Sequence, residues 1–145
     1  MYEHRSEELQ IAGRLDIDTT GLLLITDNGQ WNHRLTSPRS DCAKIYEVGL
    51  AEPVGANYQA ALAEGVMLEN EKHRCLPAHM NQIDEHHLTL SIAEGKYHQV
   101  KRMFAALGNH VVTLHRFQVG DIVLDTNLEP GEYRALTDIE VTSIQ

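Results

Sequence analysis

The sequence predicts one α+β domain over residues 1–145, with a mixed, largely antiparallel sheet and flanking helices. Short apolar segments of strand length are intermixed with segments of helical periodicity, without the regular strand–helix–strand rhythm of a parallel α/β fold. No internal repeat, low-complexity tract or Pro/Gly-rich linker divides the chain. With 145 residues and 42% hydrophobic content, the chain is long enough for one modest core.

Six segments are predicted to be strands because they are apolar or alternate between apolar and polar residues. They are 22–26, 44–50, 77–83, 88–92, 110–114 and 117–124. The turn sequence Asp27-Asn28-Gly29 closes the first strand, and the polar residues 84–87 separate the third strand from the fourth.

Four helices are predicted between these strands. They cover residues 30–35, 53–62, 96–107 and a short segment after residue 136. Gly65 is the expected C-cap of the second helix, and Thr137 or Asp138 is the expected N-cap of the last.

The formal charge of −9 is unevenly distributed. Residues 91–119 contain four basic side chains against Glu94 alone, so this segment carries an excess of three positive charges and the rest carries −12. An acidic body with one basic segment is compatible with focused contact to RNA and equally with an ordinary solvated surface.

Neither the cysteines nor the histidines form a metal-binding pattern. Cys42 and Cys75 are far apart in sequence and are expected to be reduced thiols of a cytoplasmic protein. The nine histidines contain no HxH or HExxH array. No run approaches the roughly 18 apolar residues of a membrane span, so we expect no membrane partner.

The segment from Gly13 to Leu22 places a carboxylate, Asp16, beside Arg14 on a glycine-bracketed loop that enters an apolar strand. A loop anchored on a buried strand can hold a reactive side chain in place. The simplest interpretation of Asp16 is a turn aspartate that bonds its own backbone. A small hydrolase that uses Asp16 with Asp18 is a further alternative.

A calcium loop is another interpretation of this segment. Asp16, Asp18, Thr20, Gly21 and Asp27 fall at positions 1, 3, 5, 6 and 12 of the EF-hand pattern. The match is poor, because position 5 offers only a hydroxyl, position 12 is Asp rather than Glu, and residues 22–25 are apolar.

The remaining interpretation is chemistry at a nucleoside. Such chemistry breaks the bond between the base and the sugar. A carboxylate suits this reaction as a nucleophile or base. The target base must first leave its stack, and a neighbouring arginine can fill the gap or hold a phosphate. In an extended loop, Arg14 and Asp16 would point the same way.

The segment Glu94 to Met103 contains a cluster of polar and basic residues followed by a helical pattern. Val100, Met103, Phe104 and Leu107 define the core face of this helix. His98 and Arg102 fall opposite that face, whereas Lys101 falls at its edge. At the edge a lysine can bury its stem and reach a carboxylate. An ordinary solvated amphipathic helix is the alternative.

These segments resemble the pseudouridine synthases of the RsuA type, which modify small-subunit ribosomal RNA. Gly13-Arg14-Leu15-Asp16 with Thr19-Thr20-Gly21-Leu22 matches the family's catalytic segment. Lys44-Ile45-Tyr46 is similar to the segment whose tyrosine stacks on the target uracil, although a packing role for Tyr46 is the alternative. The resemblance covers residues 13–141.

The resemblance implies a fold, a reaction and a set of site residues. The fold would be the pseudouridine synthase catalytic core, and the reaction would need no cofactor. The implied catalytic residues are Asp16, Tyr46 and Lys101, the last as ion-pair partner of Asp16. The residues expected to contact RNA are Arg14, His98, Gln99, Arg102 and Arg116. The expected partner is small-subunit ribosomal RNA or an assembly intermediate.

The front of the chain departs from the family. Relatives of this type usually begin with a small S4-like RNA-binding domain and a strand that carries a Lys-Pro-x-Gly segment, and neither is found in the sequence. We therefore expect a catalytic domain that is truncated at the front. An exposed sheet edge beside the aspartate loop could then pair with a second copy. A non-catalytic or vestigial RNA-binding domain is the alternative function.

Overall fold

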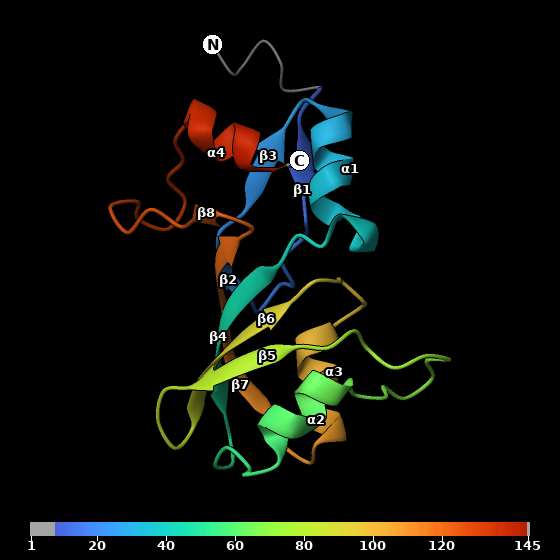
Figure 1. Ribbon diagram of the computed structural model, residues 1–145. Coiled ribbons are helices and arrows are strands. Elements are labelled where there is room, and N and C mark those ends of the chain that lie inside the picture. The colour runs from blue at the N-terminus through green and yellow to red at the C-terminus, as the bar shows by residue number, and fades with distance from the viewer. Residues whose placement is uncertain (1–7, 145) are drawn as a thin grey trace.

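The computed structural model of the protein describes residues 8–144 and places β4 (Lys44–Leu50) at the centre of the main sheet (Figure 1). The sheet order is β2 (Thr20–Gly21), β7 (Val111–Val119), β4, β6 (His87–Ile92) and β5 (His79–Gln82), with β8 (Ile122–Val123) also paired to β7. Among the strands that the structure describes, only the β2–β7 pair is parallel. The predicted α+β class with a mixed, largely antiparallel sheet is therefore confirmed.

The strands agree with the prediction except near the aspartate loop and in β7. Of the predicted strand 22–26, only β3 (Leu24–Thr26) is a strand, and it pairs with β1 (Gln10–Ala12) in a separate two-stranded sheet, whereas residues 22–23 connect it to β2. The predicted break at residues 115–116 is absent, since β7 continues through both positions. His115 pairs with Glu47 and Arg116 pairs with Tyr46 on β4, so polar residues there do not end the strand.

The helices are α1 (Gly29–Thr36), α2 (Tyr58–Glu64), α3 (Gln99–Ala106) and α4 (Asp138–Ser143), with a 3-10 turn at Pro38–Ser40. α2 and α3 begin later than predicted. Val54 before α2 donates its amide to Glu85, and His98 before α3 has φ 47, which is not helical. Thr137, one of the two residues predicted as the N-cap of α4, forms a capping box with Glu140.

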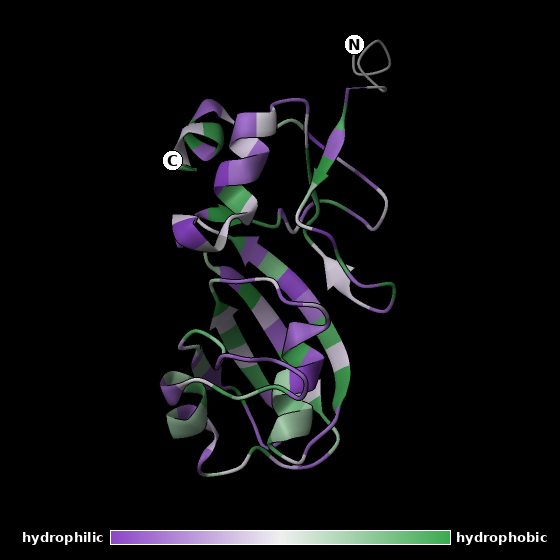
Figure 2. Cartoon of the chain, turned by 90° about the vertical axis from the view of Figure 1, so that its right-hand side faces the viewer, coloured by the Kyte–Doolittle hydropathy of each residue, from purple (hydrophilic) through white to green (hydrophobic). Residues whose placement is uncertain are grey.

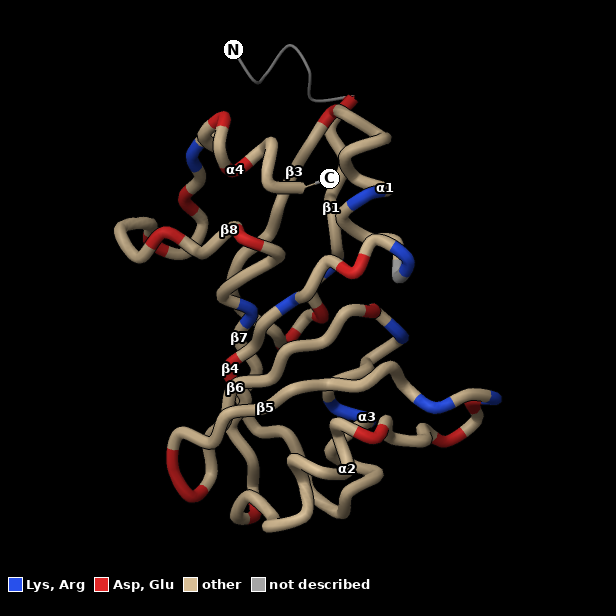
Figure 3. The backbone as a smooth tube through the Cα atoms, viewed as in Figure 1, with Lys and Arg blue, Asp and Glu red and all other residues tan. Residues whose placement is uncertain are grey.

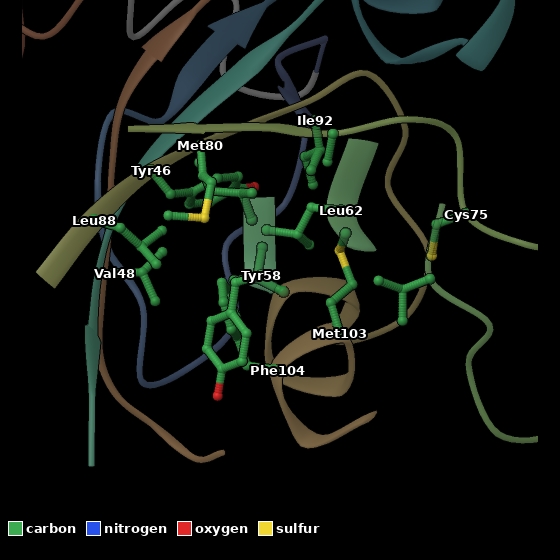
Figure 4. Packing of buried hydrophobic residues seen from close by; sticks show 14 of the residues in the cluster. Tyr46, Val48, Tyr58, Leu62, Cys75, Met80, Leu88, Ile92, Met103 and Phe104 are labelled. Carbon is green, nitrogen blue, oxygen red and sulfur yellow. The ribbon is translucent and has the colours of Figure 1, made fainter. Parts of the chain in front are cut away.

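Two hydrophobic clusters form the core. In the larger cluster, α2 and α3 cover one face of the β4–β6–β5 sheet, with Phe104 and Met103 fully buried beside Tyr58 (Figure 4). The smaller cluster joins β1, β3, α1, β8 and the C-terminal segment through residues that include Trp31 and Ile144. Strand residues alternate between hydrophobic and hydrophilic, as Figure 2 shows, so the outer sheet face is polar.

β7 connects the two clusters, because Leu114 belongs to the larger and Val119 to the smaller. The aspartate loop, residues 13–19, joins β1 to β2 and reaches β7 where the clusters meet. Within residues 8–144, no helix has the length and apolar character needed to cross a membrane.

Candidate active site on the aspartate loop

The aspartate loop is fastened to β7 by main-chain contacts at its end. Leu22 donates its amide to the Arg116 carbonyl at 2.7 Å, and a turn inside the loop is closed by the Thr19 amide on the Asp16 carbonyl at 2.9 Å. Gly21 has φ +122, and a Cβ there would lie 2.1 Å from the Arg116 carbonyl oxygen. Only glycine fits this approach, because both the backbone angle and the space exclude a side chain.

Arg116 fastens the same loop with its side chain. It is 1% exposed, and its guanidinium donates to the Leu22 carbonyl at 3.0 and 2.8 Å and to the Gly13 carbonyl at 2.9 Å. The sequence predicted that Arg116 contacts RNA. Its donors instead satisfy carbonyls of the chain's own loop inside the molecule, so Arg116 positions the loop.

The carboxylate of Asp16 faces two side chains from the start of α3. Lys101 Nζ lies 3.6 Å from Asp16 Oδ2, and His98 Nε2 lies 3.7 Å from Asp16 Oδ1. About a third of the Asp16 side chain is exposed, so the carboxylate is open to a ligand from one side. An adjacent cation favours the charged form of a carboxylate.

Lys101 also bonds Asp18, which is the closer of its two acidic partners. The hydrogen bond from Lys101 holds the pKa of Asp18 below its usual value. Asp18, followed by Asp16, raises the pKa of Lys101. The ammonium group therefore bridges the two carboxylates of the loop, whereas the sequence predicted a pair with Asp16 alone.

Tyr46, which the resemblance assigns to uracil stacking, belongs to the larger hydrophobic cluster (Figure 4). It is a buried residue of β4, and Arg116 is its partner on β7. Burial raises the pKa of the Tyr46 hydroxyl, Asp16 adds to this increase, and Arg116 opposes it. Tyr46 therefore lies within electrostatic reach of both the carboxylate and the guanidinium, and it stays protonated at neutral pH.

His98 reaches Asp16 because it precedes the helix instead of lying on its solvent face. It is the N-cap of α3 in the left-handed conformation, with φ 47 and ψ 41. The Gln99 amide bonds the Lys96 carbonyl at 3.1 Å and closes the turn. The expected position of His98, opposite the core face of a helix that began at residue 96, is therefore wrong.

Gln99 occupies a different environment from the RNA contact that the sequence predicted. It is buried, donates its amide to Glu94 Oε1 at 2.9 Å, and accepts the Lys96 backbone amide at 2.9 Å. Glu94 in turn accepts the Leu76 amide at 2.7 Å. Gln99 therefore braces the loop before α3 and is closed to an RNA partner.

Arg102 bonds two loops, although the sequence predicted that its side chain is exposed to solvent. Its guanidinium donates to the Tyr97 carbonyl at 2.9 Å and to the Glu69 carbonyl at 2.8 Å, and lies 3.6 Å from Glu71. Arg14, in contrast, is exposed on the aspartate loop, as an RNA-contacting residue must be. Figure 3 shows acidic positions in loops at both ends of the molecule and basic positions on α3.

Among residues 8–144, no three His, Cys, Asp or Glu side chains lie close enough together to hold a metal ion. The sequence did not predict that Arg116 holds the aspartate loop against β7. Its spacing of two from Leu114 on a strand places both on the inward face, and that spacing was the available signal.

Comparisons with known proteins agree with these motifs. The family model for RNA pseudouridylate synthase matches residues 1–106. Ribosomal small subunit pseudouridine synthase A of Vibrio vulnificus (strain CMCP6) is 59% identical over 144 residues, which are 98% of this chain and 62% of that protein. The synthase A of Escherichia coli (strain K12) is 56% identical, over 94% of this chain and 59% of that protein.

Solved structures give the same assignment. A crystal structure of a pseudouridylate synthase matches with TM-score 0.94 and 57% identity, over 96% of this chain and 60% of that one. The archaeal box H/ACA sRNP Nop10–Cbf5 complex, at 20% identity and TM-score 0.52, shares the fold. The chain thus spans about 60% of the length of its close relatives. By its sequence and by its fold, this chain belongs to the RNA pseudouridylate synthase family.

Proposed function

We propose that the protein isomerises a uridine of small-subunit ribosomal RNA to pseudouridine, without a cofactor. The names of relatives at 56–59% identity support both the reaction and the RNA. Acting on ribosomal RNA or its assembly intermediates would place the protein in the cytoplasm.

The observation that carries this proposal is the position of Asp16. Its carboxylate is partly exposed, contacts Lys101 and His98, and lies in the electrostatic surroundings of the Tyr46 ring. A carboxylate at this position can attack the nucleoside or take up a proton. The N1–C1′ bond breaks, a C5–C1′ bond forms, and the C5 proton is lost while N1 gains one, so product and substrate are isomers.

The neighbouring residues would prepare this carboxylate and its substrate. Lys101 would fix the direction of the Asp16 carboxylate, because the two side chains are only partly open to water. By the resemblance, Tyr46 would stack on the uracil, and Arg14 on the exposed loop would occupy the place that the base leaves in its stack. His98 is available to a phosphate or a base on the open side of the site.

The test uses small-subunit ribosomal RNA labelled with tritium at C5 of uridine, since forming the C5–C1′ bond releases that atom to water. The wild-type chain should release tritium, and Asp16→Asn should not. Asp41→Asn is the matched control, because Asp41 is exposed and has φ 59, which asparagine tolerates. Release by Asp16→Asn at the wild-type rate would contradict the role of Asp16. RNA binding without release by the wild type would favour the non-catalytic alternative.

We propose in addition that a second copy pairs with the edge near the aspartate loop. β2 pairs only with β7 among the described residues, and the adjacent β1–β3 ribbon exposes Ile11 and Ile25, which are direct cross-strand neighbours. These side chains are 54% and 56% exposed, an apolar surface that association would cover. Light scattering should detect a concentration-dependent dimer, and Ile25→Lys should shift it to monomer. A monomer at all concentrations would contradict this.

A further inference from the structure

Tyr97 and His98 form a stacked pair at the entrance of α3. Their ring centroids are 3.9 Å apart and the rings are inclined by 18°. Adjacent residues of an extended chain point to opposite sides and cannot stack. The left-handed backbone at His98 turns the chain so that both rings lie on the same side.

The backbone of this pair is held in place by Arg102. Arg102 donates to the Tyr97 carbonyl at 2.9 Å and to the Glu69 carbonyl at 2.8 Å, so one guanidinium fixes the turn and the neighbouring loop. A non-glycine residue with positive φ beside a site is sustained only where its surroundings fix it. The Tyr97–His98 pair is therefore a supported element of the site.

The outer part of this pair is open. Tyr97 is 76% exposed, although its ring already packs on the imidazole, so the ring face turned away from His98 is available. His98 Nε2 is itself 3.7 Å from Asp16 Oδ1. The Tyr97 ring is therefore stacked on a residue that contacts the carboxylate. Arg102 supplies a positive charge beside Tyr97, because its guanidinium bonds the Tyr97 carbonyl.

We infer that the open face of Tyr97 binds a second nucleobase, adjacent in the RNA to the target uridine. An exposed ring beside cationic side chains is the surface on which single-stranded RNA stacks. Tyr46 is the surface for the target base, whereas Tyr97 holds its neighbour and so limits how the strand can enter the site. This inference rests on the proposed function.

The test measures binding, so that it does not depend on turnover. The probe is a single-stranded RNA octamer with one central uridine flanked by 2-aminopurine, whose fluorescence falls when it stacks. All proteins carry Asp16→Asn to prevent reaction, and the salt is kept low because the chain has a net charge of −9. The variants are Tyr97→Ala, Tyr97→Phe and, as a matched control, Tyr133→Ala, because Tyr133 is also 76% exposed but lies between β8 and α4.

Tyr97→Ala should raise the Kd about 5- to 150-fold, the equivalent of one base–aromatic stack of about 1–3 kcal/mol, and should abolish the fluorescence change. Tyr97→Phe and Tyr133→Ala should leave both unchanged. Equal Kd values for Tyr97→Ala and Tyr133→Ala would overturn the inference, as would loss of affinity in Tyr97→Phe or no binding by the parent. The tritium assay reports separately on the proposed function, so the two failures are distinguishable.

Discussion

Replacing Arg116 by methionine should remove the side-chain fastening of the aspartate loop to β7. The guanidinium makes three hydrogen bonds to two carbonyl oxygens, those of Leu22 and Gly13, and Arg116 is 1% exposed. A hydrogen bond from a charged donor contributes about 1.5–3 kcal/mol. Two buried acceptors therefore predict a loss of about 3–6 kcal/mol in the free energy of unfolding, a large share of the roughly 5–15 kcal/mol of a typical domain.

Urea unfolding followed by the fluorescence of Trp31 measures this loss, since Trp31 is the only tryptophan and is buried in the smaller cluster. Arg39→Met is the control, because Arg39 is exposed and its replacement should change stability by less than about 0.5 kcal/mol. If Arg116→Met does not fold, Arg116→Lys can still reach one carbonyl and should lose about 1.5–3 kcal/mol. A loss below about 1 kcal/mol in Arg116→Met would refute the fastening role.

Lys101→Met should lower the rate of pseudouridine formation about 10- to 150-fold, equivalent to one charge-assisted hydrogen bond of about 1.5–3 kcal/mol. Arg102→Met should mainly raise KM, because Arg102 holds the Tyr97 turn; equal losses of kcat in steady-state assays would argue against this division. The Asp18–Lys101 pair should stabilise the fold above the ordinary Asp18 pKa of 3.8 and cease to do so as pH falls through the lower folded value. The urea midpoints of wild type and Asp18→Asn should therefore differ at pH 7 and converge as the pH falls below the lowered pKa of Asp18 in the folded state. A difference that does not change with pH would contradict this linkage.

The sequence predicts elements well where local signals decide them. β4 has the predicted bounds, and Thr137 caps α4 through a local bond to Glu140. The start of α3 could not be predicted, because the left-handed turn at His98 depends on contacts from loops distant in sequence. The later start of the strand predicted over residues 22–26 likewise depends on pairing with β1.

The site shows the same division between local and distant causes. The helical face predicted that Lys101 lies at the edge of the core, where its stem is half-buried and its ammonium reaches the loop. For Gln99 and Arg116, residue type alone suggested RNA contact. Their partners are Glu94 and the carbonyls of the aspartate loop, and the latter lie about 100 residues away in sequence. Only tertiary structure decides whether a polar side chain meets a ligand or its own backbone.

The close approach of Gly21 to β7 has a consequence for the position of Asp16. At the end of the aspartate loop, the distance to the sheet is set by main-chain atoms, namely the Leu22 amide and the Arg116 carbonyl. The Arg116 side chain adds bonds to the Leu22 and Gly13 carbonyls, so the glycine and the arginine act on the same loop. A side chain at position 21 would push the loop away from β7 and would move Asp16 with it, whatever residues stand at the other core positions.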